Sequence, residues 1–90
     1  MKIPASFKLK GKLINVLWQE GDIDGDAYAV WDPNSLSITL SMSMSDKLRE
    51  EKFLHEVVHA ISDLYGLKIT ERQVEGLDGP LMRLIKKFHE

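Results

Sequence analysis

The sequence predicts an α+β fold, in which a small three-stranded antiparallel sheet is followed by two helices in the order β-β-β-α-α. Three segments before residue 43 alternate between apolar and polar residues with a period of two, and the period changes to 3.6 after residue 45. Turn-forming and helix-capping residues separate these segments. Ninety residues are enough for one domain, which we expect to span residues 1–90.

The first strand is expected over residues 7–19, "FKLKGKLINVLWQ". Its alternation changes phase between Leu13 and Ile14, which indicates a bulge or bend near Gly11 and Lys12.

The second and third strands are expected over residues 26–31, "DAYAVW", and 36–42, "LSITLSM". Asp24-Gly25 has the chemistry of a hairpin turn and is predicted to connect the first two strands. The sequence "DPNS" at residues 32–35 is typical of a tight turn, and we expect it to pair the second strand with the third.

The first helix is expected to begin after Ser45 or Asp46, either of which suits an N-cap, and to end at Gly66. Its apolar residues form one stripe that should face the sheet. This stripe consists of Phe53, Leu54, Val57, Val58, Ile61, Leu64 and Tyr65.

The second helix is predicted to begin with a capping box formed by Thr70 and Gln73. Gly79-Pro80 lies inside the helix and predicts a kink or a break there. We expect its apolar positions to face inward, and these are Val74, Leu77, Leu81, Leu84, Ile85 and Phe88.

Composition excludes several classes of protein. The sequence contains no cysteine, so disulfides, thiol nucleophiles and cysteine-based zinc sites are absent. A net charge of −2 gives no electrostatic reason to expect nucleic acid or anionic membrane as a partner. Lysines interrupt every apolar run near the N-terminus, and no window of about 18 apolar residues exists. We therefore expect neither a signal peptide nor a membrane span, and a cytoplasmic location.

The sequence "HEVVH" at residues 55–59 lies inside the first predicted helix. Residues four apart on a helix lie about 40° apart and about 6 Å along its axis, so His55 and His59 can bind one metal ion. Glu56 flanks the pair at about 100° round the helix, where a carboxylate can act as a base on metal-activated water. Both histidines fall opposite the apolar stripe. The alternative interpretation is therefore two surface histidines on a solvated face.

A third metal ligand would have to be His, Asp or Glu, because cysteine is absent. Glu71, Glu75 and Asp78 share one stripe of the second predicted helix. If the helices fold back about residue 68, Glu75 comes level with Ile61, so Glu75 is the favoured ligand. Glu71 and Asp78 remain alternatives, and each carboxylate taken alone is more often a solvated helix residue.

Two other acidic features have different interpretations. Asp63 is too far along the helix to share a metal ion with both histidines, but it could orient His59 by a hydrogen bond. Residues 22–33, "DIDGDAYAVWDP", resemble a calcium-binding loop only in their repeated acids. The sixth and twelfth positions are Ala27 and Pro33, whereas an EF-hand needs Gly and Glu there, so we predict no calcium site.

Residues 53–77, "FLHEVVHAISDLYGLKITERQVEGL", resemble the core of small phage- and prophage-encoded zinc metallopeptidases of the zincin class. Those proteins typically show an apolar lead-in, HExxH followed by Ala-Ile, a Gly-Leu turn and a Ser/Thr-Glu-x-x-Val helix start. The resemblance extends over roughly residues 10–78. The chain departs from the family pattern at Ser62, where Asp is frequent, and at Gly79-Pro80, which interrupts the second helix.

The resemblance implies a minimal zincin-like metallopeptidase domain with Zn²⁺ as cofactor and a peptide or protein as substrate. His55 and His59 would be zinc ligands, with a Glu of the following helix as the third, and Glu56 would be the catalytic base. The strand at residues 36–42 would be the edge strand along which an extended peptide lies.

Two alternatives to a peptidase remain. The chain could be a non-catalytic binding or regulatory protein that keeps the zincin frame and a structural metal. It could also be a metal-free interaction domain, which predicts no stabilisation by zinc. Glu56 separates the first of these from catalysis, because a purely structural site has no use for that carboxylate.

Overall fold

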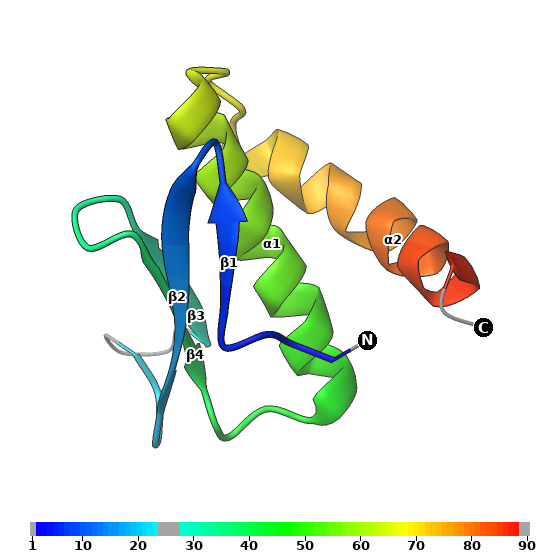
Figure 1. Ribbon diagram of the computed structural model, residues 1–90. Helices are drawn as coiled ribbons and strands as arrows, with labels where there is room; N and C mark the ends of the chain where they lie inside the picture. The colour runs from blue at the N-terminus through cyan, green and yellow to red at the C-terminus, as the bar shows by residue number, and fades with distance from the viewer. Residues whose placement is uncertain (1, 24–27, 89–90) are drawn as a thin grey trace.

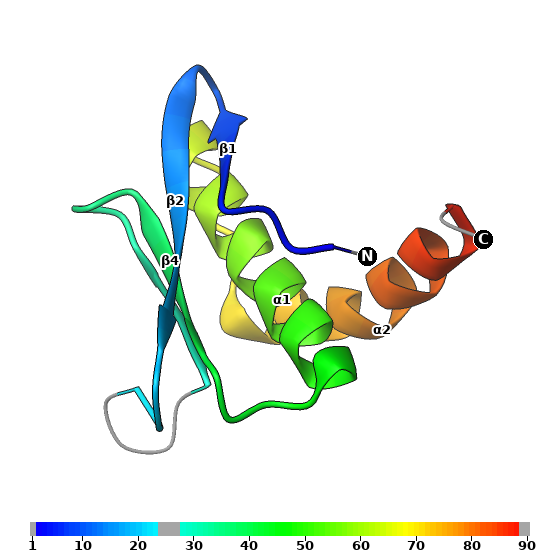
Figure 2. The same cartoon turned by 60° about the horizontal axis from the view of Figure 1, so that its bottom comes forward.

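The computed structural model describes residues 2–23 and 28–88 and has the predicted α+β architecture (Figure 1). Its elements are β1 (Ser6–Leu9), β2 (Lys12–Gln19), β3 (Ala29–Asp32), β4 (Ser37–Ser41), α1 (Asp46–Tyr65) and α2 (Glu71–Phe88). The strands form one sheet, α1 lies across one face of it, and α2 leads away from α1 (Figure 2). Within the described ranges, neither helix has the length and hydrophobicity needed to cross a bilayer.

The sheet is mixed and four-stranded, in the order β1-β2-β4-β3, which corrects the predicted set of three antiparallel strands. β2 and β4 run parallel, with Val16 opposite Ile38, whereas the other two pairs are antiparallel. Because β4 separates β2 from β3, the predicted hairpin pairing of these two strands is wrong. The Asp24-Gly25 turn itself lies outside the described residues.

The single bent strand predicted over residues 7–19 is a hairpin of β1 and β2. Lys10 (φ 53°) and Gly11 (φ 74°) both adopt the left-handed conformation that a two-residue type I′ turn requires. Phe7 pairs with Ile14, so apolar side chains on both sides of the turn face the core. The phase change in the sequence therefore marks a turn rather than a bulge.

The predicted hairpin between the second and third sequence strands is confirmed as β3–β4. Asp32 closes the turn by accepting hydrogen bonds from the Asn34 backbone N–H (2.9 Å) and the Ser35 hydroxyl (3.0 Å). These bonds to the charged form lower the pKa of Asp32. β4 lies inside the sheet and β3 lies at its edge, so the expectation that residues 36–42 form the edge strand is wrong.

Helix α1 has the caps that its sequence predicts. The Ser45 hydroxyl accepts a hydrogen bond from the Leu48 N–H (3.3 Å), and Gly66 ends the helix in the left-handed conformation with φ 63°. The N–H of Leu67 then bonds back to the Ser62 carbonyl (2.9 Å), which turns the chain sharply toward α2.

Helix α2 begins with the predicted capping box. The Thr70 N–H donates to Gln73 Oε1 (2.9 Å), and the Gln73 N–H donates to Thr70 Oγ1 (3.2 Å). The prediction at Gly79 and Pro80 was a kink or a break, and the helix continues through both residues without a break.

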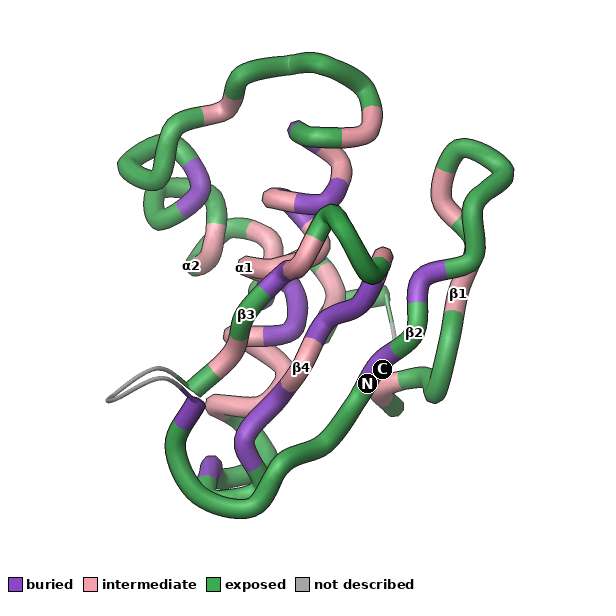
Figure 3. The backbone as a smooth tube through the Cα atoms, turned by 90° about the vertical axis from the view of Figure 1, so that its left-hand side faces the viewer, coloured by how far each residue is buried: buried purple, intermediate pink, exposed green. Residues whose placement is uncertain are grey.

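The core fills the space between α1 and the inner face of the sheet. Buried positions are concentrated on β4, the most buried strand, as Figure 3 shows. The largest fully buried apolar side chains are Ile14, Ile38, Leu40 and Val74. Both helices lie on the same side of the sheet (Figure 2), and alternate residues of β2 and β3 such as Leu17 and Val30 are exposed.

The apolar stripe of α2 is only partly buried, which corrects the prediction that all of it faces inward. Val74 is buried, whereas Leu77, Leu84 and Phe88 are 41, 48 and 76 % exposed. Met82, which was not predicted to face inward, is buried. The three exposed residues lie about 120–160° round the helix from Met82, because α1 covers only one face of α2. The two helices meet near the start of α2 and spread apart toward its end (Figures 1 and 2).

Candidate metal centre

Helix α1 places His55 and His59 on one face, one turn apart. Their ring centroids are 5.0 Å apart. Both rings are more covered than a solvated helix face would allow, with side chains 11 % and 24 % exposed. The start of α2 provides part of this cover, so the two histidines do not form a free surface pair.

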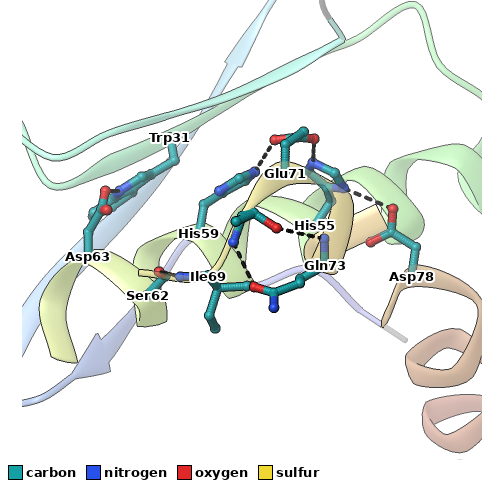
Figure 4. A network of polar contacts seen from close by, with 10 residues as sticks. Trp31, His55, His59, Ser62, Asp63, Ile69, Glu71, Gln73 and Asp78 are labelled. Carbon is teal, nitrogen blue, oxygen red and sulfur yellow. Dashed lines mark hydrogen bonds and ion pairs between the residues drawn. The ribbon is translucent and has the colours of Figure 1, made fainter. Parts of the chain in front are cut away.

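Glu71, the first residue of α2, joins the two histidines (Figure 4). One carboxylate oxygen lies 2.7 Å from His55 Nε2, and the other lies 2.7 Å from His59 Nε2. The two ring nitrogens that would bind a metal ion therefore point toward the same carboxylate.

The turn between the helices sets the position of Glu71. The buried Ser62 hydroxyl accepts a hydrogen bond from the Ile69 N–H (2.7 Å), and the capping box fixes the next residue, Thr70. Lys68 takes a left-handed conformation with φ 56°. The Ser62 hydroxyl therefore stabilises the turn between the two helices from its buried side. This role was not predicted from the sequence.

Asp78 supports His55 from the opposite side of its ring. Its Oδ2 lies 2.8 Å from His55 Nδ1, and its side chain is 15 % exposed. Burial alone would lower the pKa of His55, but the hydrogen bond and charge of Asp78, with the charges of Glu71 and Glu56, raise it above 6.5. A metal ion at Nε2 would leave Nδ1–H donating to Asp78, as metal-bound histidines usually do.

Asp63 does not support His59. It accepts a hydrogen bond from Trp31 Nε1 (2.7 Å) and so ties the end of α1 to the edge strand β3. Figure 4 shows this pair apart from the cluster of Glu71 with the two histidines. The expectation that Asp63 orients His59 is therefore not met in this structure.

His55, His59 and Glu71 form a cluster that could hold a metal ion. One ligand atom from each residue lies within 4.8 Å of the other two. Two imidazole nitrogens and one carboxylate oxygen are a donor set that catalytic zinc sites use, with a fourth position left for water. The carboxylate spans both nitrogens at 2.7 Å, so a small withdrawal of Glu71 would admit an ion between the three groups.

The cluster contains Glu71, one of the alternative ligands, rather than the favoured Glu75. Glu75 lies one turn further along α2 and lines the adjoining cavity instead. The prediction that Glu75 is the ligand assumed that the two helices lie antiparallel, side by side, after a turn at about residue 68. In the structure α2 leaves at an angle, so its first residue comes nearest to the histidines.

Glu56 faces a cavity of about 300 Å³ beside the cluster. The cavity is lined by Tyr28, Ala29, Lys52, His55, Glu56, Glu71, Glu75 and Asp78. Burial raises the pKa of Glu56 above 4.5, and the like charge of Glu71 adds to the rise. The charges of His59 and His55, and the Trp31 backbone N–H, oppose it. A carboxylate with a raised pKa next to a metal site is suited to accepting and returning a proton.

The open edge of the sheet runs past this cavity. The Ser41 N–H donates to the Tyr28 carbonyl (2.8 Å), and hydrogen-bonded pairs alternate along an antiparallel ladder. The backbone groups of Ala29 and Trp31 therefore point away from β4, toward the free edge. The interaction of the Trp31 N–H with Glu56 agrees with this direction. Tyr28 and Ala29 at the start of β3 were not predicted to be near the site, because the sequence does not reveal that β3 is the edge strand.

Comparisons with protein-family models, curated proteins and solved structures find no match for this chain. The chemistry of the site therefore rests on its own residues.

Proposed function

We propose that this chain is a zinc-dependent metallopeptidase of the zincin class that its sequence resembles. The observation that carries the proposal is a three-residue cluster, two of whose members, His55 and Glu71, line one cavity together with Glu56. His55, His59 and Glu71 form a metal-type cluster, and Glu56 lies beside them with a raised pKa. A structural metal site needs the first three residues, whereas peptide hydrolysis needs all four.

His55 Nε2, His59 Nε2 and one oxygen of Glu71 would hold the zinc ion. A bound zinc ion would lower the pKa of its water to about 7 and polarise the scissile carbonyl. Asp78 accepts a hydrogen bond from His55 Nδ1–H and so keeps Nε2 directed at the cluster. Glu56 accepts a proton from the attacking water at its carboxylate and returns it to the leaving amine.

An extended peptide is the substrate that the edge of β3 suits best. The backbone groups of Ala29 and the carbonyl of Trp31 can hydrogen-bond to a strand laid beside β3, which would bring a peptide bond over the cavity. The Trp31 N–H already interacts with Glu56. We therefore assign the peptide-binding edge to β3 instead of residues 36–42, because β4 is already paired with a strand on each side.

A second function is a non-catalytic binding protein with a structural metal. One observation favours it: the His55–His59–Glu71 cluster joins α1 to α2 at the point where the helices meet. A metal ion there would fix the angle between the helices whether or not any peptide is cleaved.

Metal content and hydrolysis, measured on the same samples, test the proposal. Protein purified without a His tag is analysed for bound metals, and the wild type and Glu56→Gln are incubated with a library of peptides analysed by mass spectrometry. We expect about one zinc per chain in both proteins and cleavage only by the wild type. Zinc in both without any cleavage would favour the structural role. No zinc in either would refute both functions.

A further inference from the structure

A second groove is lined by side chains of α1 and α2. The two helices spread apart toward the end of α2 (Figures 1 and 2). The groove has a volume of about 230 Å³. It is lined by Lys47 and Glu51 of α1 and by Asp78, Gly79, Met82, Arg83 and Lys86 of α2. Asp78 also lines the cavity of the metal site, so the two hollows adjoin along this side chain. A peptide that leaves the metal site along α1 therefore enters the groove directly.

The groove and the cavity differ in charge. Four carboxylates and one cation line the cavity, namely Glu56, Glu71, Glu75 and Asp78 with Lys52. The groove has three cations, Lys47, Arg83 and Lys86, and its two carboxylates are Glu51 and Asp78. Asp78 is already bound to His55. Within residues 2–23 and 28–88 none of the three cations makes an ion pair, so their charges are available to a ligand.

The walls of the groove suit a side chain that carries a carboxylate. Met82 is 9 % exposed and provides an apolar floor. The Arg83 guanidinium lies against the helix at Gly79, where its Nη1 is 3.4 Å from the position a Cβ would take. A short acidic side chain could place its methylene groups on the floor and its carboxylate against the cationic rim.

We propose that this groove is a specificity subsite that binds an acidic segment of the peptide substrate. The inference rests on the proposed peptidase function, because it places the scissile bond in the cavity of the metal site. Lys47 precedes His55 by eight residues of α1, which is about 12 Å along the helix. An extended peptide covers that distance in about three to four residues. Asp or Glu is therefore expected about three to four positions from the scissile bond.

A peptide fits this arrangement better than nucleic acid does. Three cations line the groove, whereas the adjoining cavity has four carboxylates and one cation, Lys52. A nucleic acid carries a phosphate at every step and would be repelled where it left the groove. A peptide can be acidic at one position and neutral or basic at the next.

Fluorescence anisotropy tests the subsite in the zinc-supplemented Glu56→Gln variant, which should leave peptides uncut. The probes are dye-labelled peptides of about ten residues that carry Asp-Asp three to four positions before or after a central apolar pair, with Asn-Asn peptides as neutral counterparts. We expect one acidic peptide to bind about five- to tenfold more tightly than its neutral counterpart, with the difference reduced at high salt.

Charge variants, each made in the Glu56→Gln protein, locate the preference. Lys47→Ala with Arg83→Ala should reduce it to within about twofold, and Lys47→Glu with Arg83→Glu should reverse it in favour of Lys-Lys peptides. The matched control is Lys8→Ala with Lys12→Ala, which removes the same charge from the β1–β2 hairpin and should preserve the preference.

Three results would overturn the subsite. The first is equal binding of acidic and neutral peptides in both placements. The second is an equal loss of the acidic preference in the Lys47/Arg83 and Lys8/Lys12 variants. The third is an oligonucleotide that binds more tightly than the acidic peptide and loses affinity in the Lys47/Arg83 variant. Failure of the proposed function is recognised separately. In that case the wild type shows no hydrolysis, with or without bound zinc, whatever the peptide preference.

Discussion

Asp78→Asn should weaken zinc binding although Asp78 is not a ligand. Asp78 Oδ2 accepts a hydrogen bond from His55 Nδ1–H, and the two heavy atoms are 2.8 Å apart. The Asp78 side chain is 15 % exposed, so water screens the pair only partly. Asparagine keeps an oxygen that can accept this hydrogen bond but loses the negative charge. Supporting carboxylates of this kind typically contribute about 10–100-fold to metal affinity. We therefore expect a loss of about tenfold for Asp78→Asn, which corresponds to about 1.4 kcal/mol.

Asp78→Ala extends the same test, because it removes both the charge and the acceptor. Its loss should approach 100-fold, or about 2.7 kcal/mol. Competition with a fluorescent zinc chelator measures both values. Asp63→Asn is the control, since Asp63 is a carboxylate that serves Trp31 and not a histidine. Unchanged affinity in both Asp78 variants, or an equal loss in Asp63→Asn, would refute the assignment of Asp78 as the partner that orients His55.

Three further predictions follow from the same contacts. Glu56→Gln should lower kcat by about 10²–10⁴-fold while zinc content stays near one per chain, as peptide assays and elemental analysis would show. The pKa values of His55 and Glu56 are both raised in the metal-free chain, so their contribution to stability is complete below the unfolded pKa values and is lost as pH rises through the folded ones. Urea unfolding of metal-free protein should therefore show stability falling above about pH 4.5 because of Glu56, and falling further above about pH 6.5 because of His55. The stabilisation that zinc adds should instead grow with pH as the ligands lose their protons, and equal slopes with and without zinc would contradict this. Ser62→Ala removes the acceptor of the Ile69 N–H and should lower the free energy of unfolding by about 1–3 kcal/mol, and a loss below about 0.5 kcal/mol would show that the turn does not depend on that hydroxyl.

Features set by short-range interactions could be predicted from the sequence. The Ser45 cap, the Thr70–Gln73 capping box and the Asp32 turn each depend on residues within four positions of one another, and all three were predicted. The common face of His55 and His59 follows from helical spacing alone. Each of these features needs only the local conformation of the backbone.

Features that depend on the relative placement of elements could not be predicted in the same way. The phase change near Leu13 is compatible with a bulge or with a turn, and only the pairing of Phe7 with Ile14 decides between them. The parallel pairing of β2 with β4 leaves no local signal in the sequence, because β3 lies between these two strands in the chain but on the far side of β4 in the sheet. The sequence therefore gave no means of identifying the edge strand.

The choice of Glu71 over Glu75 depends on the direction in which α2 leaves the turn. That direction is set by the left-handed conformation of Lys68 and by the bond from Ile69 to Ser62. A lysine rarely takes a left-handed conformation, so the identity of residue 68 does not predict this backbone geometry. One helical turn of α2 separates the two glutamates, and a change of angle between the helices is enough to exchange them.

Calorimetric titration of zinc into metal-free wild type, Glu71→Gln and Glu75→Gln shows which glutamate binds the metal ion. We expect one zinc per chain in the wild type and in Glu75→Gln with affinities within about twofold, because Glu75 only lines the cavity. Glu71→Gln should bind zinc at least about 100-fold more weakly, since it loses the carboxylate that meets both histidines. Normal binding by Glu71→Gln, together with loss in Glu75→Gln, would contradict the proposed metal centre.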